Sequence, residues 1–221
     1  MFFGKNKDRS VRDEDKLWSE RTRKYDGILE DSEDLIKEDH SVLIVFHFEE
    51  TKDEIQTLLH NRKRAWNDLI SAIDLSKWTD GYFSNKICMV RSDLIINSIS
   101  ENDSVIQTHG KLYIIVAEHY PLLERDEDVI AWTQKISPCT MCFHESLDSG
   151  LLRTFGSDKI ASLLEKMSWD KNTFMSHSFI TKAVENAQRK ISERATGDVR
   201  AESDQKWFEY NYDKPLDSIQ S

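Results

Sequence analysis

The strongest constraint on the fold is a nearly uninterrupted apolar run at residues 41–48, which reads SVLIVFHF. The run is rich in β-branched residues, which is typical of a strand covered on both faces of a sheet. A helix start follows directly, because Thr51 and Glu54 have the spacing of a capping box. The pattern therefore predicts a buried strand that leads at once into a helix.

The rest of the chain continues this alternation. Apolar periodicity predicts helices over 16–38, 51–73 and 124–134, and short strands over 86–90, 111–117 and 142–145, with a polar loop or weak helix over 92–108. From Ser146 onward the pattern is helical, and it includes a longer helix over 175–194. Strands that alternate with helices favour an α/β fold, here a mostly parallel sheet with flanking helices and a C-terminal helical segment.

The same patterns suggest a division of the chain. Its 221 residues suit one large domain, or one domain with an appended arm. Residues 1–15 are charged and lack periodicity, so we expect a flexible arm there. We expect an α/β domain over 16–150 and a helical extension over 151–221.

Composition excludes several classes of protein. A net charge of −10 argues against a broad phosphate-binding surface, so we expect no nucleic-acid partner. No run of eighteen apolar residues predicts a membrane span, and the first residues lack the apolar core of a secretory signal. We therefore expect a cytoplasmic protein that reaches a membrane, if at all, through a partner.

Two thiols and an imidazole lie within six residues, at Cys139, Cys142 and His144. These are ligand types that zinc prefers, but zinc sites usually have four ligands and no fourth is evident. A redox pair uses the same Cys-x-x-Cys spacing. Two small side chains in the core near a strand are a third interpretation. Zinc therefore stays one of three open alternatives.

Two histidines follow or end predicted strands. His47 lies in the first strand and His119 just after the third, so either can face a cleft at the carboxyl edge of the sheet. A structural histidine is the more common outcome. The acidic run at 126–128 is interpreted as a solvated face, since 40 acidic residues make such runs unremarkable in a chain of this charge.

The C-terminal half carries a resemblance to a known family. Residues 146–160 read SLDSGLLRTFGSDKI, and 184–194 read VENAQRKISER. They resemble the second RecA-like nucleotide-binding domain of the SecA preprotein-translocase motor, where it passes into the long scaffold helix. The SecA family has "SLEDDLMRRFGSDRI" and "ENAQKR" there. Fainter similarity extends over about 16–213, so the resemblance implies a RecA-like fold.

The departures from the family pattern concern nucleotide chemistry. The family's glycine-rich "NMAGRGTDI" is replaced by RSDLIINS at 91–98, and its "QLRGRSGRQGDPG" by VIAWTQKISP at 129–138. Phosphoryl transfer needs cationic clamps and a metal-binding P-loop. No G-x-x-x-x-G-K-[ST] motif occurs in these 221 residues. The sequence thus predicts a degenerate ATPase lobe without catalytic or cofactor-binding residues carried over.

The leading hypothesis is therefore a non-catalytic, SecA-like accessory or interaction module. Expected partners are SecA, the translocation channel or a preprotein. The helix over 175–194 offers an apolar stripe for such a contact, unless the stripe packs on its own domain. The candidate contact residues on this stripe are Phe179, Ile180, Val184 and Ile191. The alternatives are a metal- or redox-dependent protein and a sensor that binds nucleotide without hydrolysis.

Overall fold

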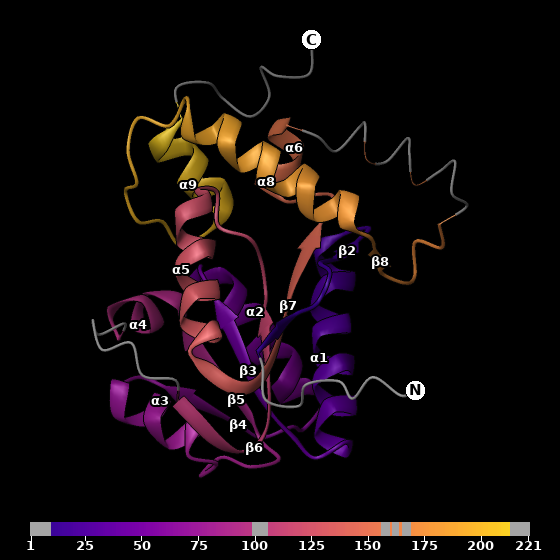
Figure 1. The fold of residues 1–221 in the computed structure, drawn as a ribbon. Coiled ribbons are helices and arrows are strands. Elements are labelled where there is room, and N and C mark those ends of the chain that lie inside the picture. The colour runs from indigo at the N-terminus through magenta and orange to yellow at the C-terminus, as the bar shows by residue number, and fades with distance from the viewer. Residues whose placement is uncertain (1–9, 99–105, 156–159, 161–163, 165–168, 213–221) are drawn as a thin grey trace, which may run out of the picture.

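The computed structural model describes residues 10–98, 106–155, 160, 164 and 169–212. Within these residues the chain forms one mostly parallel sheet of eight strands with helices around it (Figure 1). The strands are β1 (Val11–Arg12), β2 (Lys16–Trp18), β3 (His40–Phe46), β4 (Trp66–Leu69), β5 (Ile87–Arg91), β6 (Ile106–Val116), β7 (Ile136–Ser146) and β8 (Met175–Ser176). The helices are α1 (Arg21–Lys37), α2 (Glu49–Asn61), α3 (Ala72–Thr79), α4 (Ser92–Asn97), α5 (Leu123–Gln134), α6 (Gly150–Phe155), α8 (Ser178–Ser192) and α9 (Asp204–Asn211).

The strand order is β4-β5-β3-β6-β7-β2-β8, and β1 also pairs with β7. Every pairing between these strands is parallel except that of β2 with β8. The predicted fold class, an α/β protein with a mostly parallel sheet and flanking helices, is confirmed.

Two apolar clusters cover the two faces of the sheet. Helices α1 and α2 pack one face of β3, β5 and β6, through residues such as Ile28, Ile55 and Ile44. Helices α3, α4 and α5 pack the other face, where Trp78 and Trp132 stack at 6.5 Å. Coverage on both sides explains why β3 reads as a continuous apolar run.

A third cluster lies among the C-terminal helices α6, α8 and α9. In Figure 1, α8 passes over the carboxyl end of β7. This cluster also takes in Leu17, Phe48 and Tyr120, which precede the expected boundary at residue 150. The C-terminal helices therefore share a core with the sheet. The division at 150 stays a prediction.

The N-terminal residues differ from expectation. Residues 1–9 of the expected arm lie outside the described residues, but β1 pairs with β7 and Asp15 is fully buried. The helix predicted over 16–38 begins only at Arg21, since Lys16–Trp18 pairs with β7 as β2. Gly27 has a packing role in α1, because a Cβ there would overlap the Trp18 indole.

Three other element predictions need correction. Helix α2 begins at Glu49 after Phe48, so Thr51 is not its cap. Residues 66–69 were predicted as helix but form β4, because their backbone pairs in parallel with β5 at the edge of the sheet. The C-terminal helix begins at Ser178, where the His177 side chain accepts the Phe179 N–H.

Candidate functional site

Polar side chains gather where the parallel strands β3, β6 and β7 end. His47 follows β3, Glu118 and His119 follow β6, and Glu145 lies at the end of β7. The carboxyl ends of parallel strands meet at one edge, so these four residues become neighbours. All four are buried, with at most 8% of their surface exposed.

His119 lies at the centre of this edge, between two carboxylates. Its Nδ1 is 2.6 Å from Asp126 Oδ2, and its Nε2 is 3.3 Å from Asp15 Oδ2. Burial disfavours the charged ring, but Asp126 and Asp15 outweigh that penalty and raise the pKa of His119 to about 10. The ring is therefore an imidazolium at neutral pH, and it stacks on Phe143 at 4.4 Å.

Asp126 connects the sheet edge to the C-terminal helices. It lies in the first turn of α5 and accepts hydrogen bonds from Tyr120 N at 3.0 Å and Gln188 Nε2 at 2.7 Å. Burial opposes ionisation, but His119 and the other donors lower the pKa of Asp126 well below its usual range. Gln188 also donates to the Tyr120 carbonyl oxygen at 2.7 Å. The Gln188 side-chain amide therefore connects helix α8 by hydrogen bonds to the carboxyl edge of the sheet.

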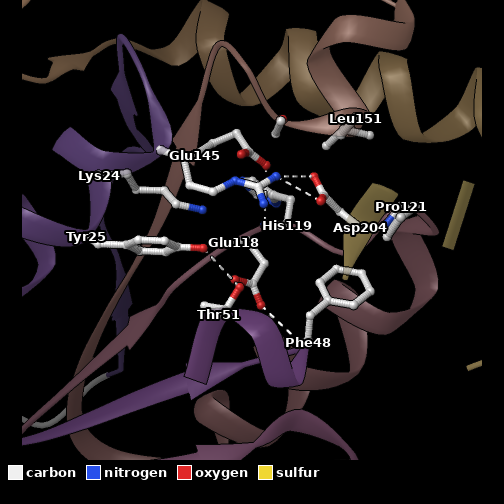
Figure 2. Close-up of a pocket in the computed structure, with 12 residues that line it drawn as sticks. Lys24, Tyr25, Phe48, Thr51, Glu118, His119, Pro121, Glu145, Leu151 and Asp204 are labelled. Carbon is white, nitrogen blue, oxygen red and sulfur yellow. Dashed lines mark hydrogen bonds and ion pairs between the residues drawn. The ribbon is translucent and has the colours of Figure 1, made fainter. Parts of the chain in front are cut away.

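A small pocket lies beside this network (Figure 2). Lys24 and Tyr25 point toward Glu118 across it. Glu118 Oε1 accepts the backbone N–H groups of His47 and Phe48, whereas its Oε2 is buried without a hydrogen bond to a described residue. The free volume of about 10 Å³ has room for about one water molecule, so the pocket is too small for a substrate.

Arg21, at the start of α1, connects the C-terminal helices to the helices that pack on the sheet. Its Nη2 donates to both oxygens of Asp204, at 2.8 and 2.9 Å, and its Nη1 donates to Glu50 at 3.0 Å. Asp204 also accepts the Gly150 N–H at 2.7 Å. The two ion pairs of Arg21, together with the Gly150 hydrogen bond to Asp204, therefore join α1 and α2 to the starts of α6 and α9.

The other half of the carboxyl edge is open. A cleft of about 290 Å³ lies beyond β3, β4 and β5, with Phe46, Leu69 and Met89 in its wall. Arg91 lines this cleft and is 3.1 Å from Glu49 and 3.2 Å from Asp93. The edge is therefore covered at one end and accessible at the other.

The structure does not bring the predicted metal ligands together. Side chains alternate between the faces of a strand, so Cys139 in β7 points away from Cys142 and His144. Burial raises the pKa of both thiols to about 12, which keeps them protonated. Among the described residues, no group of three His, Cys, Asp or Glu side chains is placed to hold a metal ion.

His144 has its own partners in this structure. Its Nδ1 accepts the Trp18 Nε1–H at 3.2 Å, and its Nε2 is 3.3 Å from Asp31. Burial lowers the pKa of His144, although Asp31 opposes the shift. A neutral ring that accepts from tryptophan is a structural histidine.

The predicted contact stripe on α8 faces inward. Ile180, Val184 and Ile191 are fully buried in the third cluster, and Phe179 packs partly against it. The first three are therefore unavailable to a partner. The stripe packs on its own protein, as the alternative interpretation held.

Sequence reasoning found part of this site. His47 and His119 lie at the carboxyl edge, which the sequence analysis gives as one possibility beside the more common structural role. Asp126, which the sequence predicts on a solvated face, is only 2% exposed. Asp15 was assigned to a loose arm. The sequence did contain a signal for this site, because Gln188 lies in the stretch at 184–194 that resembles SecA. Its side chain donates a hydrogen bond to Asp126.

Comparisons with known proteins place the chain. No protein-family model matches it. It is 25% identical to the protein translocase subunit SecA 1 of Chlorobium chlorochromatii over 189 residues, which are 82% of this chain and 18% of the relative. It is 35% identical to SecA of Acidithiobacillus ferrooxidans over 86 residues, 38% of this chain and 9% of the relative. The chain thus spans less than a fifth of the length of these curated relatives.

Other comparisons add a structure and a further SecA. The C-terminal part of the Fun30 ATPase domain matches 77% of this chain and 54% of its own, with a TM-score of 0.44 and 14% identity. In the described residues, no helix combines the length and apolarity that crossing a bilayer requires. SecA of Phocaeicola vulgatus is 23% identical over 83% of this chain and 17% of its own length. By these matches, most of this chain is a SecA-related segment.

Proposed function

We propose that this SecA-related segment serves protein translocation as an interaction module that does not hydrolyse nucleotide. The names of its relatives point to translocation. The observation that carries the rest of the proposal is the composition of the covered carboxyl edge. Its buried acids, Asp15, Glu118, Asp126 and Glu145, outnumber its buried cations, Lys24 and His119.

A carboxylate-rich edge is a poor receptor for phosphate. Each buried carboxylate repels a phosphate group strongly, because the interior screens charge weakly. The cations there already have carboxylates beside them, as His119 has Asp126 and Asp15. Phosphoryl transfer depends on cations that are free to bind the phosphates. The covered edge therefore supports a role that does not use nucleotide energy.

The outward face of α8 is the surface we propose for partners. Lys182, Asn186 and Arg189 are exposed and lie on one face of the helix at spacings of four and three residues. The opposite face holds the helix on its own core. The proposed partners are SecA, the translocation channel or a preprotein.

Two measurements on the full chain test the nucleotide part of this proposal. We expect no ATP turnover and no rise in melting temperature with millimolar ATP or ADP. A ligand that binds only the native state must raise its stability, so a shift without turnover would instead identify a nucleotide sensor. Turnover that follows the protein through purification would overturn the proposal.

Site-specific crosslinking tests the contact surface. A photo-reactive residue at Lys182 or Arg189 should crosslink to one of three purified candidates, offered separately: SecA, the channel in vesicles, or an unfolded preprotein. The matched control is the same residue at Lys77 on α3, a helix that packs the face of the sheet opposite α1 and α2. Equal crosslinking at both positions, or none with any candidate, would contradict the proposed surface.

A further inference from the structure

Two strands place a serine beside a histidine at the carboxyl edge. β3 and β5 are paired in parallel, and Phe46 lies opposite Arg91 in their register. The next residues along each strand are His47 and Ser92. The register therefore brings these two side chains to the same height.

The two side chains make a direct contact. Ser92 Oγ is 2.8 Å from His47 Nδ1, and the two residues are only 4% and 8% exposed. On the far side of the ring, His47 Nε2 is 3.3 Å from Asp126 Oδ1, although this contact is not aligned as a hydrogen bond. In the tautomer that carries its proton on Nε2, this proton lies on the side of the Asp126 carboxylate and Nδ1 can accept from the Ser92 hydroxyl. Hydroxyl, imidazole and carboxylate in this order are the parts of a serine nucleophile with its base.

A pocket of about 90 Å³ opens onto this pair. Its wall includes His47, Ser92, Arg125 and Arg200, together with the carboxylates of Asp93 and Asp198. Arg125 pairs with Asp198 at 2.9 Å, whereas the Arg200 side chain is 62% exposed and lies 3.5 Å from Glu49. Arg200 is therefore the looser of the two cations and is placed to bind an anionic group that enters the pocket.

We propose that Ser92, His47 and Asp126 form an esterase site for short esters whose acyl chain carries a second carboxylate. The small volume favours a short acyl chain, and Arg200 favours the carboxylate at its end. This site is separate from the proposed translocation role and uses no nucleotide.

The reaction balances with water as the only co-reactant. Ser92 Oγ bonds to the ester carbonyl carbon as its proton passes to His47 Nδ1. The bond from that carbon to the leaving oxygen then breaks, and the alcohol departs with the proton from His47. Water attacks the acyl-serine, gives a proton to His47, and releases the acid as Ser92 regains its hydrogen. The sum is ester plus water to acid plus alcohol.

Covalent labelling of the full chain tests the nucleophile. A fluorophosphonate probe should label Ser92, as located by peptide mass spectrometry, and the Ser92→Ala variant should lose the label. Ser98→Ala is the matched control, since the Ser98 hydroxyl donates to the Ile95 carbonyl oxygen of its own helix. Circular dichroism and melting temperature establish that each variant is folded. An unlabelled Ser92 in folded protein, or label on another serine, would overturn the proposal.

Hydrolysis rates test the base and the substrate class. The 4-nitrophenyl monoester of succinic acid should react faster than 4-nitrophenyl butyrate, and Arg200→Gln should remove this preference. Ser92→Ala and His47→Gln should each lower the rate by roughly a hundredfold or more, while Ser98→Ala should keep it. A wild-type rate in Ser92→Ala would refute the site. The ATP measurements above give the same answer either way, so failure here leaves the proposed function standing.

Discussion

Both halves of the carboxyl edge contain a cationic side chain paired with carboxylates, but helices cover only one of the two halves. Over β6 and β7, His119 and Asp126, which belongs to α5, are covered by α8, and both are nearly unexposed. Over β3, β4 and β5, Arg91 has two carboxylate neighbours as well, but its side chain remains 30% exposed beside an open cleft. Burial, rather than the number of ion pairs, should decide which half holds the fold together.

Substitution of Asp126 tests this comparison most directly, because it should lower the stability of the covered half the most. Asp126→Ala leaves a buried imidazolium with one carboxylate, deprives the Tyr120 N–H of its acceptor and removes one of the two acceptors of Gln188. We expect the free energy of unfolding to fall by about 3–5 kcal/mol, as for other broken buried pairs. Urea unfolding measures this loss.

Glu127→Ala is the control for that loss, since Glu127 is exposed on the same helix. It should change the unfolding free energy by no more than about 0.5 kcal/mol. Similar losses in the two variants would mean that the covered network is no more stabilising than a surface charge.

The pH dependence of stability sharpens the comparison. The pKa of His119 is about 10 in the folded protein, against an ordinary value of 6.5. A raised folded pKa gives stability that is complete below pH 6.5 and is lost as pH rises toward 10. The unfolding free energy should thus fall over this window, by up to about 1.4 kcal/mol per pH unit for this one proton.

Urea unfolding at pH 6.5, 8 and 9.5 would follow that decline. His119→Gln should be less stable than the wild type at pH 6.5 and should show a flatter slope above it. An unchanged slope in this variant would assign the dependence to other groups.

Arg21 tests the link between the sheet and the C-terminal helices. Arg21→Gln removes the donor that holds Asp204, which has a side chain only 13% exposed. We expect a loss of about 1–3 kcal/mol, the range for a buried acceptor that is left without its hydrogen-bond donor. The control is Arg23→Gln, because Arg23 is exposed and bonds only to Asn172 in the described structure. Equal stability of the two variants would contradict the role of Arg21 in holding the C-terminal helices in place.

The smallest effect belongs to the open half. Arg91→Gln should cost less than about 1 kcal/mol, since its pairs with Glu49 and Asp93 are partly exposed and screened by water. Thermal unfolding in low and high salt measures it. A loss of stability as large as that of Asp126→Ala would show that burial beneath helices does not make the ion pairs of one half more stabilising than those of the other.

Local patterns predicted much of the sheet. β3, β5 and α5 were found because their apolar spacing reflects a face that each presents to the core. β4 was missed because Trp66 and Leu69 are three residues apart, a spacing that fits a helix as well as this short strand. A four-residue strand at a sheet edge carries too little periodicity to be told from a helix.

The candidate site was harder to predict because its members are distant in sequence. The histidines could be placed at the edge, since a strand's end defines where its next residue goes. Asp15 and Asp126 could not be identified as their partners, because most aspartates in such a chain are solvated. Only the resemblance at 184–194 pointed to Gln188, and it gave no partner for that amide.

The amino-acid sequence by itself determined an α/β order, a doubly covered strand and a SecA-like C-terminal run, because periodicity and motif are local properties. Tertiary structure alone decided that β1 and β2 join the sheet, that Cys139 and Cys142 face apart, and that α8 seals one half of the carboxyl edge. Burial of a polar group depends on every element packed around it, so no local pattern reveals it. The charge of His119, held between Asp15 and Asp126, is the clearest product of that packing.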